Sequence, residues 1–107
     1  MITRIEHPSW CHVSSCTVSQ SGTGTHVSRT AVLDPDPLNA VHTTLRLIQN
    51  PPIPGYPTTG VTMVEILVTI PSYDPEISDE EFSFILSGAR AHGLGTLLLA
   101  AGREAMS

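Results

Sequence analysis

The feature that most constrains this chain is its first third, which gathers metal-ligand side chains in a segment without a hydrophobic pattern. Residues 7–16 read HPSWCHVSSC and hold both cysteines and the only tryptophan, and GTHVSR follows at residues 24–29. Ser, Thr and Gly fill much of the remainder, so apolar residues do not recur at helix or strand spacing. Such a segment cannot stay ordered by core burial alone and needs another kind of crosslink.

Four side chains in this segment have the chemistry of a zinc site. His7, Cys11, Cys16 and His26 are separated by three, four and nine residues. Thiolate and imidazole are ligands that Zn²⁺ prefers, and four of them close a tetrahedral site with no position for water. Metal binding would then supply folding free energy to a segment that has no core. The sequence therefore predicts one structural zinc ion, with His12 as an alternative to His7.

Three alternatives to zinc remain open at this point. The cysteines are compatible with free buried thiols beside surface histidines, with a Cys11–Cys16 disulfide, or with a cysteine nucleophile and its histidine base. No oxyanion-hole motif and no recognisable nucleophile signature accompany Cys11 or Cys16. We therefore expect no catalytic residues and predict that the protein is not an enzyme.

Residues 31–86 predict a small antiparallel sheet of three to four strands. AVHTTLRLIQ and FSFIL alternate in polarity, and VTMVEILVTI is β-branched and apolar on most of both faces, which favours a central strand. HVSRTAVL is compatible with a short further strand. Proline-bearing segments separate these stretches and exclude regular structure between them. The predicted strands lie at residues 26–33, 40–49, 61–70 and 82–86.

The last part of the chain predicts one helix over residues 87–105, capped by Ser87. SDEE offers a rival capping box with a helix from Asp79, but FSFIL is β-prone and alternates, so we favour a strand there. From Ser87 onward the helical period places five apolar residues on one face. Leu99 and Met106 fall outside that face and indicate either a dimer contact or a broad core face. The shared face is formed by Ala91, Leu94, Leu98, Ala101 and Ala105.

The predicted architecture is therefore α+β, with one C-terminal helix packed on the sheet. At 107 residues the chain predicts a single domain over 1–107, with a Cys/His segment at 1–30, strands at 31–86 and the helix at 87–105. Hydrophobic residues make up 40% and charged residues only 14% of the chain. That apolar balance indicates a surface used for self-association or for a protein partner.

The charge of the chain argues against a nucleic-acid partner. Formal net charge is −5, and five Arg are scattered and unpaired in a sequence without Lys. Nucleic-acid-binding domains usually present a basic stripe that neutralises phosphates. The alternative function, a nucleic-acid-associated regulator with a zinc finger, needs Arg4 and Arg29 on one surface, with Arg46 as an optional third.

No stretch of the sequence predicts contact with a membrane. No run approaches the roughly 20 apolar residues that span a bilayer, and the N-terminus, MITRIEHPSW, has no apolar signal-peptide core. We expect a cytoplasmic protein. In that compartment close cysteines are more often thiols or metal ligands than a disulfide.

Two stretches, PSWC at residues 8–11 with Cys16 and His26 after it and LSGARAHGLGTLLLAAGREA at residues 86–105, together resemble a family of small actinobacterial and actinophage proteins that has no established activity. Those chains typically read C-P-x-W-C, then two His, and close with L-[ST]-P-x-E-A-x-x-L-A-x-A-L-x-x-A-A. Here PSWC stands at residues 8–11, and His7 and Cys16 replace a Cys and a His of the pattern, which keeps zinc-ligand types. Gly88, Gly93 and Gly95 replace better helix formers. The matching helix positions are Leu86, Ser87, Ala91, Leu94, Leu98 and Ala101.

The resemblance implies a compact zinc-bearing α+β domain of phage or bacterial origin, and it implies no substrate. Together with the apolar, acidic composition, it favours a non-enzymatic interaction or regulatory module. The expected partner is another protein, such as a host protein if the chain is phage-borne, or a second copy in a homodimer.

Overall fold

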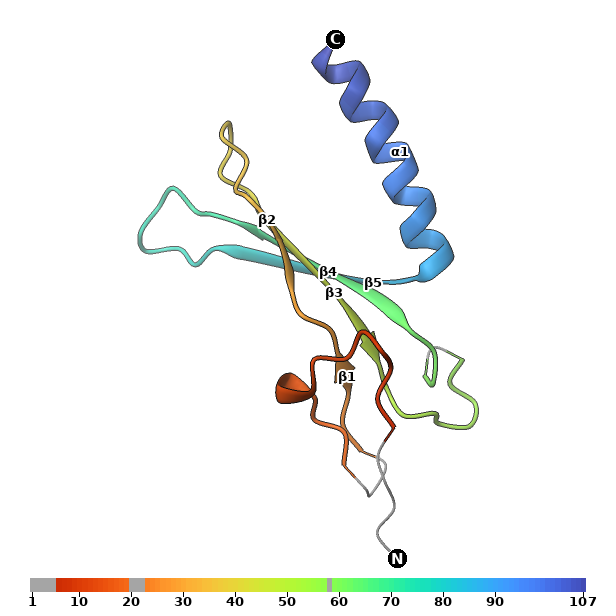
Figure 1. Ribbon diagram of the computed structural model, residues 1–107. Helices are drawn as coiled ribbons and strands as arrows, with labels where there is room; N and C mark the ends of the chain where they lie inside the picture. Colours follow the sequence, from red (N-terminus) through yellow and green to blue (C-terminus); the bar gives the residue numbers. More distant parts are fainter. Residues whose placement is uncertain (1–5, 20–22, 58) are drawn as a thin grey trace, which may run out of the picture.

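The structure is a computed structural model that describes residues 6–19, 23–57 and 59–107, and it shows an α+β fold (Figure 1). The predicted class, an antiparallel sheet with one C-terminal helix packed on it, is confirmed, but the sheet has five strands rather than three to four. The extra strand arises because the segment 26–33 forms two short strands instead of one. The elements are a 3₁₀ turn at Val13–Ser15, β1 at His26–Val27, β2 at Ala31–Leu33, β3 at His42–Gln49, β4 at Met63–Ile70, β5 at Glu80–Ser87 and α1 at Gly88–Met106.

β4 lies inside the sheet, as its apolar composition predicts. The strand order is β1-β3-β4-β5, and β2 also pairs with β3. All pairs are antiparallel, so residues that lie opposite each other point to the same side of the sheet. Two cross-strand rows thereby form what we call the apolar face, which consists of Leu45, Ile66 and Phe84 in one row and Leu47, Val64 and Leu86 in the next.

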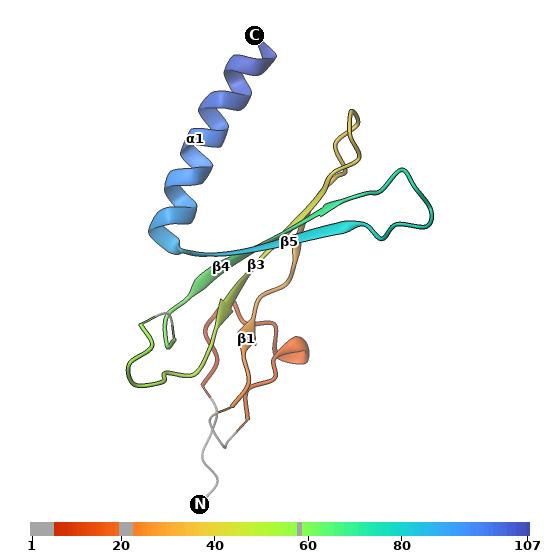
Figure 2. The ribbon, with the colours of Figure 1, turned by 180° about the vertical axis from the view of Figure 1, so that it is seen from behind.

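Helix α1 begins where the sequence predicts, because Ser87 caps it. The Ser87 hydroxyl accepts a hydrogen bond from the backbone N–H of Arg90 at 3.2 Å. The helix packs on β5 and β4 through its first turns and then leaves the sheet (Figures 1 and 2). Ala91 is its only half-buried residue, and the rest of the helix is exposed. Leu99 and Met106 are 55% and 82% exposed, so the expectation of a broad core face within this chain is wrong.

The buried core is very small. Among the described residues only Val27 and Ile48 are buried, and these two lie opposite each other on β1 and β3. The radius of gyration is 17.3 Å, whereas a compact chain of this length has about 13 Å. The single chain is therefore open, with most of its sheet and helix in contact with solvent.

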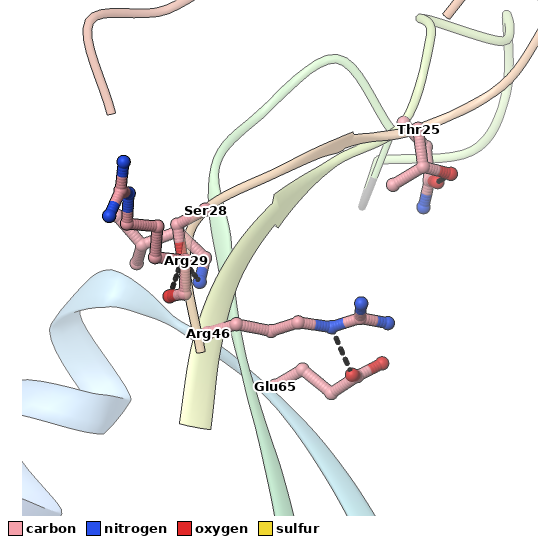
Figure 3. A network of polar contacts seen from close by, with 7 residues as sticks. Thr25, Ser28, Arg29, Arg46 and Glu65 are labelled. Carbon is pink, nitrogen blue, oxygen red and sulfur yellow. Dashed lines mark hydrogen bonds and ion pairs between the residues drawn. The ribbon is translucent and has the colours of Figure 1, made fainter. Parts of the chain in front are cut away.

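Polar contacts attach the residues on both sides of His26 to β3 and to Asn50, which follows it. The Ser28 hydroxyl accepts from the Leu47 N–H at 2.8 Å, and the Thr25 hydroxyl donates to Asn50 Oδ1 at 2.8 Å. Figure 3 shows this region together with an ion pair in which Arg46 Nε lies 2.7 Å from Glu65 Oε1. The expectation that the arginines are unpaired is thus wrong for Arg46, because strand register places Glu65 directly opposite it.

Within the described part of the chain, no helix has both the length and the apolar character needed to cross a membrane.

Candidate metal centre

Short turns bring the two halves of the N-terminal segment together. The Pro8 carbonyl accepts from the Cys11 N–H at 2.9 Å and closes a turn over Ser9 and Trp10. The 3₁₀ turn then reverses the chain, and the Cys16 N–H bonds back to the carbonyl of His12 at 3.1 Å. Cys11 and Cys16 therefore lie at the two ends of a compact bend.

The segments around Thr17 and Thr25 are hydrogen-bonded side by side and form what we call the ribbon, which places Cys16 beside His26. The Thr17 N–H donates to the Thr25 carbonyl at 3.2 Å, and the Thr25 N–H donates to Thr17 Oγ1 at 2.9 Å. The His12 N–H donates to the Val27 carbonyl at 2.7 Å and attaches the bend to β1. His26 is thus held by the sheet on one side and by the ribbon on the other.

Gly24 allows the close approach within this ribbon. Its φ is +97°, and a Cβ atom at this position would lie 2.0 Å from the Thr17 carbonyl oxygen. Positive φ favours glycine, and the steric overlap is with backbone rather than with a movable side chain. Gly24 was not among the predicted site residues, although a glycine two residues before a predicted ligand was the available signal.

Replacing Gly24 with alanine is therefore expected to separate the ribbon strands and to weaken metal binding by at least about tenfold, because Cys16 moves away from His26. Gly55→Ala is a matched control, since Gly55 has φ +85° but a Cβ atom added there would have no neighbour within 4 Å. Zinc affinity measured by competition with a chromophoric chelator distinguishes the two variants. Equal affinities for both variants would contradict the role given to Gly24.

The structure brings all four predicted ligands together. Their ligand atoms lie within 4.8 Å of one another. Cys11 Sγ lies 3.5 Å from His7 Nδ1 and 3.6 Å from His26 Nδ1. Cys16 Sγ lies 3.7 Å from His7 Nδ1 and 3.4 Å from His26 Nδ1. The two imidazole rings meet edge to face, with centroids 5.1 Å apart.

These distances match a tetrahedral zinc site. With Zn–S near 2.3 Å and Zn–N near 2.0–2.1 Å, tetrahedral angles separate sulfur from nitrogen by about 3.6 Å. The four sulfur–nitrogen distances range from 3.4 to 3.7 Å and so lie on both sides of that value. The residues present therefore fit a single Zn²⁺ ion at their centre.

Hydrogen bonding alone accounts less well for the four contacts. Each thiol donates one hydrogen, and each Nδ1 either donates or accepts. Two thiols and two Nδ1 atoms thus support only two ordinary hydrogen bonds, whereas the structure has four sulfur–nitrogen contacts of similar length. One central cation would satisfy all four ligand atoms at once.

Desolvation shifts the pKa values of two of the four groups, Cys11 and His26, in the direction that favours the neutral form. Desolvation raises the pKa of the Cys11 thiol, the neighbouring Cys16 adds to the effect, and a hydrogen bond from the Val27 backbone acts in the opposite direction. Desolvation also lowers the pKa of His26, and the nearby His7 acts in the same direction. Reactive cysteines have lowered pKa values, and the pKa of Cys11 is shifted in the opposite direction.

The structure also decides between the alternatives for individual residues. His12 lies outside the cluster, because its ring Nδ1 is 3.0 Å from Ser15 Oγ and 3.1 Å from Ser14 Oγ. Both cysteines are free, so the Cys11–Cys16 disulfide is absent. The histidine rings contact the thiols, an arrangement that fits a shared metal ion better than the alternative of free thiols with surface histidines.

Comparison of the chain with protein-family models, with curated proteins and with solved structures finds no match. The function of the site therefore has to be inferred from its own geometry.

Proposed function

We propose that this protein is a small structural-zinc protein that acts as a non-enzymatic protein-interaction or regulatory module. The observation that carries the metal assignment is the set of four sulfur–nitrogen distances between 3.4 and 3.7 Å. Zinc fits better than harder cations, because thiolate and imidazole in tetrahedral arrangement favour Zn²⁺ over Mg²⁺ or Ca²⁺.

The donor set supports a structural rather than a catalytic role. Catalytic zinc sites use three protein ligands and keep one position for water or substrate. Here four side chains converge, so a bound ion would have no open position. Among the described residues of the segment that carries the ligands, only Val27 is buried, and the ion would supply the ordering that the small core does not.

Exposed apolar surface on the sheet and the helix supports the interaction role. The resemblance of the PSWC motif and the helix pattern to actinobacterial and actinophage proteins supports a bacterial or phage origin, with a host protein or a second copy as partner and the cytoplasm as location. A role in binding nucleic acid has less support, since the net charge is −5 and Arg46, the optional third arginine, is paired with Glu65. Arg4 lies outside the described residues.

Titration with Co²⁺ tests the donor set directly, because tetrahedral Co²⁺ with thiolate ligands absorbs strongly in the visible range. We expect one equivalent to bind, with a spectrum typical of two sulfur and two nitrogen ligands. His7→Ala should weaken Co²⁺ binding at least about tenfold, on the scale of lost ligand support. His12→Ala is the matched control and should bind like the wild type.

The opposite result for the two histidine variants would show that His12 is the ligand and would contradict the geometry described above. A weak spectrum typical of six-coordinate Co²⁺ in the wild type would overturn the four-ligand assignment itself.

A further inference from the structure

The apolar face is the largest feature of the fold that the metal centre does not explain. Its six side chains form two continuous rows across β3, β4 and β5. Phe84 is 51% and Leu45 is 43% exposed, and the other four are only half-buried. None of the six is polar, so the chain places an unbroken hydrophobic surface in contact with water, which a stable soluble monomer avoids.

Helix α1 carries a second apolar surface that its own sheet leaves uncovered. Leu94, Leu97, Leu98 and Leu99 are between 39% and 69% exposed. At 100° per residue they extend over more than half of the helix circumference, and a helix with so broad an apolar surface is usually buried against more than one neighbour.

The connection between β5 and α1 explains why the helix does not cover its own sheet. Ser87 ends β5 and Gly88 begins α1, so no linker residue allows the helix to turn back flat onto the strands. Both ribbon views show the helix diverging from the sheet after this junction (Figures 1 and 2). Near the junction, a groove of about 630 Å³ lies between Leu86 and the helix residues Leu94 and Leu97.

The excess of exposed surface has the size of a dimer interface. The accessible surface of the chain is 8391 Å², whereas a compact monomer of this mass has about 5,800 Å². Stable homodimers with large apolar interfaces bury about 1,000–2,500 Å² on each chain. The difference, about 2,600 Å² by the same scaling, is enough for such an interface.

We infer that this protein forms a two-fold symmetric homodimer in which α1 of each copy lies on the apolar face of the other. A second copy fits because each chain carries one uncovered helix and one uncovered sheet face, and a two-fold axis satisfies both surfaces at once. The six residues of the apolar face and the four leucines of α1 are all uncharged, so none of these ten side chains brings a like charge against the other copy.

The inference names the partner of the interaction role proposed above and rests on that role, but it does not depend on the metal. In both views α1 and the N-terminal segment lie at opposite ends of the molecule (Figures 1 and 2). Oligomeric state and metal content are therefore separate measurements on one sample, and a monomer that contains zinc would overturn the dimer while leaving the metal centre intact.

Sedimentation velocity with the wild type and two substitutions on β5 tests the inference. Phe84 and Ile85 are adjacent, 51% and 54% exposed, and point to opposite sides of the sheet. We expect twice the chain mass of 11.4 kDa for the wild type, a dimer dissociation constant raised at least about tenfold by Phe84→Gln, and little change with Ile85→Gln.

A second pair keeps the test decisive if Phe84→Gln fails to fold. Leu98→Gln changes a helix residue that is 62% exposed in the single chain, and Leu38→Gln makes the same change at a loop residue that is 94% exposed. Dissociation by Leu98→Gln alone supports the inference. A folded wild-type monomer, an assembly larger than a dimer, or equal effects of Leu98→Gln and Leu38→Gln would each overturn it.

Discussion

Replacing Cys16 with serine is expected to weaken zinc binding by at least about a hundredfold. The substitution removes one of two thiolates, and a serine hydroxyl does not ionise to replace it. Changes that only disturb the groups around a zinc ligand already cost about 10–100-fold in affinity, so the loss of a ligand should cost more. Cys16 Sγ is within 3.7 Å of both imidazole nitrogens, and its loss leaves three donors and an open position.

Competition with a chromophoric chelator measures the effect, and Thr17→Ser is a suitable control. Thr17 is the next residue along the ribbon and keeps its hydroxyl after this change, so its bond to the Thr25 N–H is retained. Wild-type affinity in the Cys16→Ser variant would show that Cys16 is not a ligand and would contradict the four-ligand site.

Removal of the metal is expected to increase amide exchange selectively in residues 6–19 and 23–28. Zinc bound at a free concentration 1,000 times its dissociation constant stabilises the ordered form by about 4 kcal/mol, which corresponds to about a thousandfold in protection. The segment has only Val27 as a buried residue, so little else would hold it. Strands β3, β4 and β5 are each eight residues long and pair with one another, so their amides should keep their protection from exchange.

Hydrogen exchange followed by mass spectrometry, with and without a chelator, measures this difference. The Cys16→Ser variant provides the control, because its N-terminal segment should exchange rapidly before any chelator is added. Equal loss of protection in β4 and in the N-terminal segment would instead indicate that the metal stabilises the whole fold, and no loss in either would contradict a structural ion.

The strands and the helix were predictable because local sequence specifies them. Alternation in residues 40–49 and 82–86 corresponds to β3 and β5, and the Ser87 cap corresponds to the start of α1. The division of residues 26–33 into two strands was not predictable. It arises where the Ser28 hydroxyl accepts from the Leu47 N–H, and this contact depends on a residue 19 positions away.

The position of α1 relative to the sheet could not be predicted from the sequence either. Helical period identifies an apolar stripe but not the surface that covers it. The predicted stripe exists, yet Leu94 and Leu98 remain 39% and 62% exposed, because the helix follows β5 without a linker. Tertiary geometry, rather than the pattern, determines what the stripe contacts.

The candidate site was predictable in its ligand types but not in the choice between neighbouring histidines. Spacing and chemistry pointed to His7, Cys11, Cys16 and His26, and left His12 as a possible replacement for His7. The fold separates the two, because His12 is held by its N–H bond to the Val27 carbonyl and by its ring contacts with Ser14 and Ser15. The N–H bond forms only where the bend meets β1.

The most direct test of the structural-zinc assignment is the zinc-to-protein ratio of the purified wild-type chain, measured by elemental analysis beside Cys16→Ser. The geometry predicts about one zinc per wild-type chain, from one four-ligand set, and a ratio near zero for the variant. A metal-free wild-type protein that melts at the same temperature before and after incubation with Zn²⁺ would contradict the assignment.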